Sequence, residues 1–296
     1  MDHGQNQQSN TQSHQCRDEV LAESRNHEVQ AVISYQLSLQ TESLYREEIL
    51  QHLEYMQDIT LPDAAMVAAQ KEITWSTRSR LIDFLVGAHG HLGLAPQALF
   101  LSINLVDRYC SRRKVLRGHY WLLGSASLLI ASKYGDKRPG DTRRNHPSIR
   151  EISGLCCGVF NAATIAQMEM SVLNTLDWVV GHPTVDCFVE MLLLGVERDE
   201  EFKNMVAYIC EIALYHHEFV STKPSIVAEA SLLLAQEVLQ QDATSRVGTS
   251  DLVRGTLKTL SAHLRHPRPV LEHKFSTPKR SRVAQLLLNF CHQHTR

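Results

Sequence analysis

Three pairs of histidines have a spacing that could serve metal chemistry: His89 with His91, His216 with His217, and His292 with His294. Zinc sites usually combine histidines with paired cysteines, or place two histidines four positions apart on one helix. None of these pairs has the spacing of a zinc protease motif, and no Cys-x-x-Cys pair accompanies them. The sequence therefore predicts no metal site. Glycine-rich loops that hold phosphates are also absent from the sequence, so we expect no nucleotide and no other cofactor.

Cys156 and Cys157 could supply a nucleophile, because a thiolate activated by a histidine attacks carbonyl groups. Free cysteines are more often buried and inert, so we interpret the two as a structural pair buried in a helix. The chain is then expected not to be an enzyme. Its seven cysteines are scattered, which is typical of reduced thiols in the cytosol or nucleus, and we expect the protein in both.

One charged residue ends a long apolar stretch. The uncharged run from 118 to 132 stops at Lys133. At 15 residues it is too short to span a bilayer, and it is rich in small polar residues, so it predicts a buried helix and no membrane association. A well-placed lysine at the end of a helical core favours a surface for another protein over a pocket for a small molecule.

Helical periodicity runs through most of the chain, and no strand-like alternation occurs. The first set of predicted helices covers residues 76–89, 96–112, 117–134, a segment opened by the capping box Ser148-x-x-Glu151, and 162–176. The second set covers residues 185–194, 202–215, 224–239, 250–264 and 279–290. Residues 135–147 are polar and rich in glycine and proline, which predicts a loop.

The fold class that follows is all-α, with two tandem domains of five helices each. We place the first domain, with a short preceding helix, at residues 41–181 and the second at 182–296, with the boundary near Pro183. Residues 1–40 are rich in Gln, Ser, Asn and His and are expected to be a disordered tail without a secretory signal.

The net charge of −2 predicts neither general affinity for nucleic acid nor attraction to a membrane surface. Charge is nevertheless uneven, because residues 254–296 contain nine Lys and Arg residues and one acid, Glu272. A solvated basic edge and a surface for an acidic partner both remain open at this point.

Several segments resemble the cyclin box. Residues 75–86 (WSTRSRLIDFLV), 106–111 (VDRYCS) and 128–134 (LLIASKY) resemble its first three helices, and residues 168–184 its fifth helix and exit. Residues 223–226 and 275–283 resemble the second cyclin fold. The motifs occur in the family's order over residues 43–290 and look most like fungal G1/S-type cyclins, which are related to the B type.

The resemblance implies a partner, a cyclin-dependent serine/threonine kinase, and two contact residues, Lys133 and Glu169. A lysine offers three donors and a carboxylate several acceptors, so the pair could satisfy backbone groups of the partner. A local salt bridge without further function is the alternative interpretation. The resemblance also implies that Arg78 and Asp107 form a structural ion pair between the first and second helices of the box.

The family's substrate-docking patch is altered in this chain. Leu81 and Arg117 match it, Phe84 and Trp121 replace the usual Trp and Gln, and Thr77 replaces the usual Met. Gly87 stands where an acid is usual, so docking of basic Arg-x-Leu substrates is not expected, whereas an apolar groove or ordinary core packing remains open.

The resemblance therefore implies a regulatory subunit that binds and activates a cyclin-dependent kinase, and we expect it to act at the G1/S transition. No Arg-x-x-Leu destruction box occurs in residues 1–42, which favours this phase. Two alternatives stand: a mitotic B-type cyclin, or a transcription-associated double-cyclin-fold module that binds nucleic acid or polymerase machinery. Nucleic-acid binding is not expected, given the near-neutral charge.

Overall fold

Helices make up the regular structure of this protein. The computed structural model describes residues 29–30, 32–34, 36–37, 40, 44–135, 146–241 and 250–293, and in these residues it contains no strand. The all-α fold class is confirmed. Among the same residues, no helix combines the length and the apolar character that a membrane span requires.

The chain divides into two units, Met1–Leu53 and Glu54–Arg296. Residues 1–28, where disorder is predicted, lie outside the described residues, and the described positions between 29 and 40 are helical with exposed side chains. The short helix predicted ahead of the first domain is α2, Arg46–Ile59, which begins in the first unit and ends in the second.

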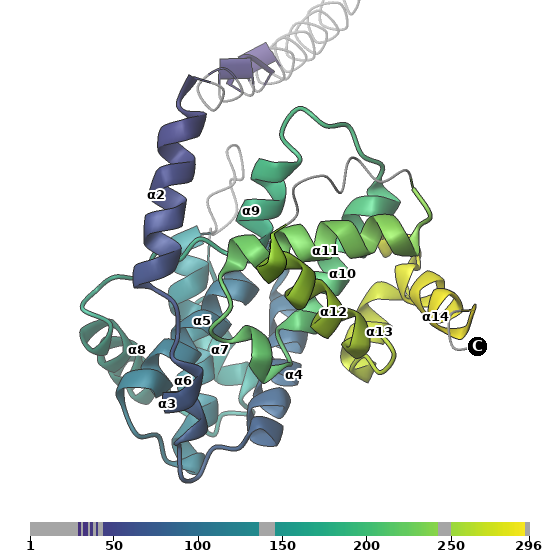
Figure 1. Ribbon diagram of the computed structural model, residues 1–296. Helices are drawn as coiled ribbons and strands as arrows, with labels where there is room; N and C mark the ends of the chain where they lie inside the picture. Colours follow the sequence, from purple (N-terminus) through teal and green to yellow (C-terminus); the bar gives the residue numbers. More distant parts are fainter. Residues whose placement is uncertain are drawn as a thin grey trace, which may run out of the picture. The chain divides into compact units, whose positions relative to one another are not determined.

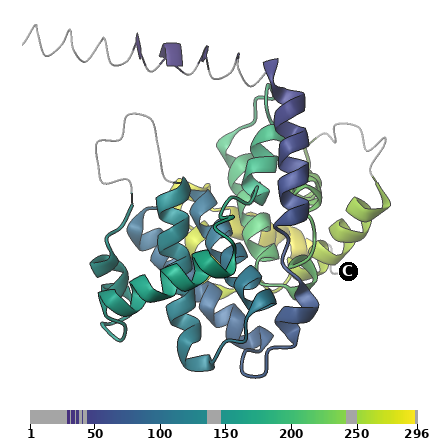
Figure 2. The same ribbon diagram turned by 90° about the vertical axis from the view of Figure 1, so that its left-hand side faces the viewer.

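The first helical set of the second unit contains the five predicted helices and one that was not predicted, the short α3 (Figure 1). It consists of α3 (Ala64–Ala68), α4 (Trp75–Leu92), α5 (Pro96–Arg112), α6 (Arg117–Gly135), α7 (Ile149–Leu155) and α8 (Ala162–Thr175). Helix α5 packs against α6, and α6 packs against α8. Helix α8 faces the viewer in Figure 2. The predicted loop at 135–147 falls mostly outside the described residues.

Local signals in the sequence explain where these helices begin and end. Asp63 caps α3 by accepting hydrogen bonds from the amides of Ala65 and Met66, and Ser148 forms the predicted capping box with Glu151. Helix α4 ends at Gly93, whose φ of 63° is the left-handed conformation that glycine adopts without strain.

The second helical set departs from the sequence expectation near its end. It consists of α9 (Val185–Leu192), α10 (Glu200–Ala213), the 3₁₀ turn η1 (His217–Phe219), α11 (Pro224–Val238), α12 (Asp251–His263), α13 (Pro269–Phe275), the 3₁₀ turn η2 (Pro278–Arg280) and α14 (Val283–Gln293). The periodicity predicted one final helix over 279–290, whereas the structure has α13, η2 and a later α14. The prediction missed α13 because Pro267 and Pro269 look like a loop, although Pro269 occupies the first turn of the helix, where proline is tolerated.

The interior of the first set depends on a close approach between α4 and α6. Leu81 on α4 is 1% exposed, and a Cβ atom at Gly124 on α6 would lie 2.6 Å from its Cδ1 atom. Only glycine leaves room for this leucine without a shift, so Gly124 sets the separation of the two helices.

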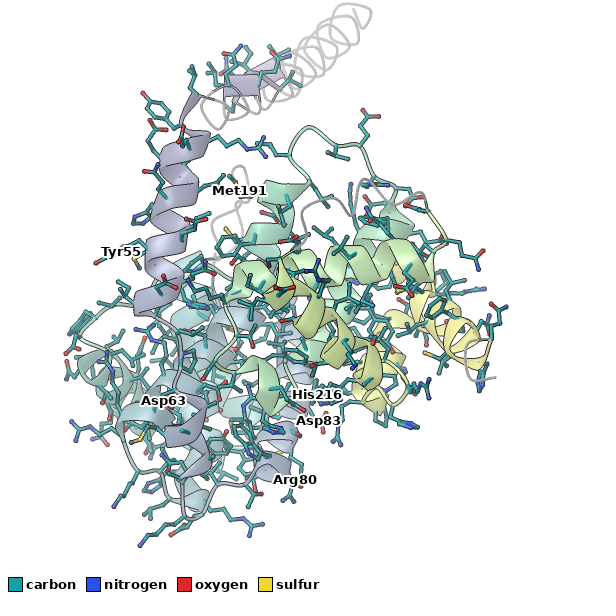
Figure 3. The ribbon with its side chains drawn as sticks, in the orientation of Figure 1. Tyr55, Asp63, Arg80, Asp83, Met191 and His216 are labelled. Atoms are coloured by element: carbon teal, nitrogen blue, oxygen red, sulfur yellow. The ribbon has the colours of Figure 1, made fainter. Side chains whose placement is uncertain are left out.

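Polar contacts join the two helical sets within the second unit. Asp83 on α4 is labelled in Figure 3. The Tyr215 hydroxyl donates to Asp83 Oδ1 at 3.1 Å, and the Arg268 guanidinium pairs with the same carboxylate. Helix α13, which Arg268 precedes, packs against α4. Helix α13, which was not predicted from the sequence, therefore helps to hold the two helical sets together.

A single amide organises the connection between α5 and α6. The Gln70 side-chain nitrogen donates to the carbonyl oxygens of Cys110 and Arg113, both at 2.7 Å. Its side-chain oxygen accepts from the Val115 amide at 3.0 Å. The turn that leads into α6 is thus fixed by one residue that follows α3.

Candidate functional site

Lys133 and Glu169 meet at a partly exposed rim of the first helical set. Lys133 lies in the last turn of α6, where a cation is favourable for the helix dipole, and Glu169 lies on α8, which packs against α6. The Lys133 Nζ atom is 2.6 Å from Glu169 Oε1, and the side chains are 37% and 13% exposed. The structure therefore brings together two residues that are 36 positions apart.

This pair can interact further while it stays intact. An ammonium group carries three donors and a carboxylate can accept several hydrogen bonds, so one mutual contact leaves capacity on both sides. Partial exposure keeps the desolvation cost small compared with that of a buried pair. A partner segment laid across the rim could accept from the lysine and donate to the glutamate.

Exposed aromatic and apolar side chains occur on the same elements. Tyr134, directly after Lys133, is 60% exposed, and a Cβ atom at Gly181 would lie 2.6 Å from its hydroxyl oxygen and 3.9 Å from Cε of Met56. The end of α6, the end of α2 and the segment after α8 therefore meet at this tyrosine. Further exposed apolar side chains on these segments are Tyr55, Ile59, Met170 and Trp178.

The sequence analysis did not select these exposed residues. Large aromatic and apolar side chains in water are informative when they gather, because such surfaces often contact partners. Trp178 lies within residues 168–184, which resemble the fifth helix and exit of the cyclin box, and a tryptophan directly after a predicted helix was the available signal. Exposure itself cannot be read from the periodicity of a short segment.

Arg78 and Asp107 form a buried, two-pronged ion pair between α4 and α5. The Nε atom donates to Oδ1 at 2.9 Å and the Nη2 atom to Oδ2 at 2.6 Å, and both side chains are 4% exposed. Burial alone would lower the pKa of Arg78, but the charge and hydrogen bonds of Asp107 raise it overall. Arg78 Nη1 also donates to the Leu214 carbonyl at 2.7 Å, a link to the second helical set that the sequence did not indicate.

The residues of the altered docking patch divide into buried and accessible ones. Leu81 lies in the core, Phe84 and Trp121 are half-buried, and Arg117 is exposed at the start of α6. Thr77 is buried, and its hydroxyl contacts that of Thr74 at 3.0 Å. Of these residues, Phe84, Trp121 and Arg117 are accessible to a partner, whereas Leu81 and Thr77 are buried.

The cysteine pair differs from the expectation of a helix-buried pair. Helix α7 ends at Leu155, so Cys156 is only half-buried and Cys157 is exposed. Cys157 has a φ of 54°, which places it in the tight turn after the helix. The expectation was wrong because the Cys156 and Cys157 side chains follow the helix rather than lie on its buried face.

Internal partners use several positive charges of the basic C-terminal stretch. Lys274 pairs with Glu211 at 2.5 Å, Arg268 pairs with Asp83, and Arg254 pairs with Asp251. These charges support the fold and are less available to an acidic partner. The histidines also separate: His89 is buried, His91 is exposed, and His294 lies outside the described residues, whereas His216 and His217 lie beside Glu218 and His263.

Comparisons with known proteins agree with the observed architecture. Residues 48–181 match the family model described as "Cyclin, N-terminal domain", and residues 183–287 match "Cyclin, C-terminal domain". Together the two models cover most of the chain. An X-ray structure of a viral cyclin from herpesvirus saimiri has a similar fold, with a TM-score of 0.63, 18% sequence identity, and coverage of 73% of this chain and 96% of that one.

Curated relatives come from more than one phase of the cell cycle. The chain is 35% identical over 217 residues to the G1/S-specific cyclin CCN1 of Candida albicans, which covers 66% of this chain and 31% of that protein. It is 28% identical over 198 residues to the G2/mitotic-specific cyclin-3 of Saccharomyces cerevisiae, with coverage of 67% and 45%. The chain thus spans less than half the length of these relatives. With both domains matched and the helical architecture in place, this chain belongs to the cyclin family.

Proposed function

We propose that this chain binds a cyclin-dependent protein kinase through the rim around Lys133 and Glu169 and activates it. Cyclins are regulatory subunits of kinases and are not enzymes themselves. The observation that carries the proposal is the partly exposed ion pair at the adjoining surfaces of α6 and α8, beside the exposed Tyr134.

Activation would follow from a difference in affinity. A subunit that binds the active conformer of the kinase better than the inactive one shifts the population by that difference. The chain supplies no catalytic group in this scheme, and its rigid helices supply the shape. The rim pair would fix the register of the kinase segment, and the exposed aromatic side chains would add apolar contact area.

The experiment compares two ion pairs in the tagged, full-length chain. A Lys133→Ala, Glu169→Ala double variant should recover at least tenfold less kinase activity from cell extract than the wild type. The matched control is Glu200→Ala with Lys203→Ala, which removes an exposed pair with a distance of 2.9 Å on α10. The control should recover kinase activity as the wild type does. Unchanged recovery in the first variant, with its fold verified by circular dichroism, would contradict the site assignment.

The proposed phase of action is the G1/S transition, and the proposed location is the nucleus and cytoplasm. The 35% identity to a G1/S-specific cyclin supports the phase, while the similarity to a G2/mitotic cyclin makes the mitotic role the competing one. Affinity purification of the tagged chain from synchronised cells separates the two. Kinase recovery that peaks as DNA synthesis begins supports the G1/S role, and a peak confined to mitosis rejects it.

The patch of Phe84, Trp121 and Arg117 is proposed to contact protein substrates of the kinase. Its two half-buried aromatic side chains offer apolar area, and no acid stands at Gly87 to attract a basic motif. Phe84→Ala should lower phosphorylation of natural substrates severalfold and leave a short peptide substrate unaffected. Equal losses for both would show a defect in kinase activation instead.

A further inference from the structure

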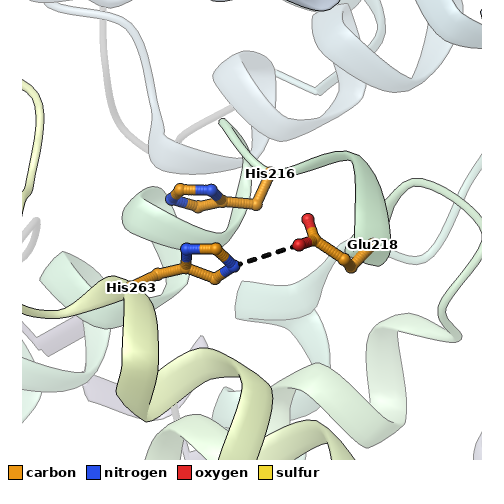
Figure 4. Close-up of side chains that lie close together, drawn as sticks. All are labelled: His216, Glu218 and His263. Atoms are coloured by element: carbon orange, nitrogen blue, oxygen red, sulfur yellow. Dashed lines mark hydrogen bonds and ion pairs between the residues drawn. The ribbon is translucent and has the colours of Figure 1, made fainter.

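Two histidines and a glutamate come together between η1 and the end of α12 (Figure 4). The imidazole rings of His216 and His263 stack with their centroids 3.5 Å apart and their planes 18° apart. His263 Nε2 lies 3.3 Å from Glu218 Oε1. One ligand atom from each of the three side chains lies within 4.8 Å of the other two.

The glutamate of this cluster is held in place by its neighbours. Its second carboxylate oxygen, Oε2, lies 3.1 Å from His217 Nδ1. The His217 ring in turn lies against Trp75 of α4, with centroids 5.4 Å apart and the ring planes tilted by 35°.

Neutral imidazole is the form of histidine that binds metals. His216 and His263 each offer a ring nitrogen, and Glu218 offers a carboxylate oxygen.

We propose that His216, Glu218 and His263 form a binding site for a divalent transition-metal ion, with Zn²⁺ as the best match. Imidazole nitrogen suits Zn²⁺, Cu²⁺ and Ni²⁺, and two nitrogens with one carboxylate oxygen form a known zinc donor set. The fourth position would hold water. The His217 contact to the free carboxylate oxygen has the geometry of an outer partner that orients a ligand.

The present separations show what must move for binding. Ligand atoms around tetrahedral zinc, with bonds of ~2.0–2.1 Å, lie ~3.3 Å apart. His263 Nε2 and Glu218 Oε1 already have this separation. The His216 ring has to rotate out of the stack until a nitrogen joins them. The ring is only half-buried, and it stands at the junction between α10 and η1 rather than inside a helix, so side-chain rotation suffices.

The location of the site gives the ion a structural role. His216 and Glu218 belong to the connection between α10 and α11, whereas His263 ends α12. His216 also lines a cavity with Arg78 and Asn104 from the first cyclin domain and Leu214 from the second. A bound ion would link α12 to this connection within the second domain, beside the cavity that the first domain also lines. This inference is independent of the proposed kinase contact, which uses α6 and α8.

The spacing of the histidine pairs along the chain predicted no metal site, because the three residues of the cluster do not form a local motif. His263 is 47 positions after His216. The fold brings Glu218 and His263 to His216. Such a set of ligands has no fixed spacing in the sequence by which it could be recognised. Only the packing of α12 beside the α10–α11 connection brings the three residues together.

To test the proposal, the full chain is treated with a chelator, and Zn²⁺ alone is then titrated into it while isothermal titration calorimetry records the binding. The wild type should bind one ion that is lost, or weakened at least tenfold, in Glu218→Gln and in a His216→Ala, His263→Ala double variant. The matched control is His91→Ala, which removes an exposed histidine outside the cluster and should retain the wild-type affinity. Substitution by Co²⁺ should give a tetrahedral visible spectrum in the wild type and in the control only.

Thermal unfolding provides a second readout with the same variants. Zn²⁺ should raise the melting temperature of the wild type and of His91→Ala, because an ion that binds only the folded state stabilises it, and should leave that of Glu218→Gln unchanged. The last variant keeps the size of the side chain, so it serves if the double variant fails to fold. Equal zinc affinity in the wild type and in Glu218→Gln, or zinc stoichiometry that no cluster substitution changes, would overturn the proposal.

Discussion

The two ion pairs of the first cyclin domain have the same shortest distance and opposite surroundings. Arg78 and Asp107 approach to 2.6 Å in the interior, and Lys133 and Glu169 approach to 2.6 Å at the rim. The interior pair is 4% exposed on both sides and makes a third bond to Leu214. The rim pair keeps 37% of its lysine side chain in water.

The difference shows that the surroundings of an ion pair, and not its distance, decide its role. The interior pair has lost its hydration, so each charge depends on the other and neither can turn towards a partner. The rim pair contributes little to stability, but it can exchange water for groups of another protein. We expect interior substitutions to cost folding free energy and rim substitutions to cost binding.

The largest effect should come from Asp107→Ala, which leaves the Arg78 charge buried without its partner. We expect the free energy of unfolding to fall by about 3–5 kcal/mol, measured by urea denaturation. Replacing both residues with apolar side chains of similar size should recover much of the loss. A change below about 1 kcal/mol in the single variant would remove the distinction between interior and rim.

Gly124→Ala tests the interior without any charge. The new Cβ atom would lie 2.6 Å from Cδ1 of the buried Leu81, and we expect a loss of about 1–3 kcal/mol in urea denaturation. The matched control is Gly87→Ala in α4, where a Cβ atom meets nothing within 4 Å, and it should stabilise the protein by about 0.5–1 kcal/mol. Equal effects at the two positions would show that α4 and α6 can separate freely.

His89 tests the interior through pH. Burial, with the charge of Lys274 adding to it, lowers the pKa of His89 from 6.5 to about 4. Between these values the unfolded chain binds a proton that the folded chain does not. The free energy of unfolding should therefore fall as the pH falls through this window, by up to about 1.4 kcal/mol per pH unit for this residue. His89→Gln should flatten the dependence measured by urea denaturation at several pH values, and the exposed His91→Gln should not. If the free energy of unfolding of His89→Gln depended on pH as steeply as that of the wild type, buried His89 would not be the source of this dependence.

The smallest change in stability should come from the rim. Lys133→Ala with Glu169→Ala should change the free energy of unfolding by no more than about 1 kcal/mol, although the same variant is expected to lose the kinase. Urea denaturation of the double variant beside that of Asp107→Ala measures the contrast directly. If the rim variant lost as much stability as the interior one, lost kinase binding could no longer be attributed to the surface.

The sequence anticipated the elements with strong local signals. Ser148 with Glu151 marked the start of α7 because capping depends on neighbouring residues, and the apolar stretches marked α5 and α6 because burial shows in composition. The Arg78–Asp107 and Lys133–Glu169 contacts were expected only through the resemblance to cyclins. Periodicity within single helices cannot show which residues of different helices meet.

What the sequence could not show depends on packing between distant segments. Helix α13 is short and begins at a proline, so its local signal was that of a loop, and its contact with α4 stabilises it. The bond from Arg78 to Leu214 joins residues 136 positions apart. The exposure of Cys157 follows from the end of α7 at Leu155, which leaves both cysteines outside the helix.

The turn before α6 depends on the side-chain amide of Gln70, and replacing its NH₂ group with an oxygen atom would disturb that turn. Its NH₂ group serves two carbonyl oxygens, and its oxygen serves the Val115 amide. Hydrolysis of this amide to a carboxylate, the chemistry of protein ageing, would change almost no volume and would set a negative charge against both carbonyls. The start of the helix that ends in Lys133 thus depends on the chemical integrity of one uncharged side chain.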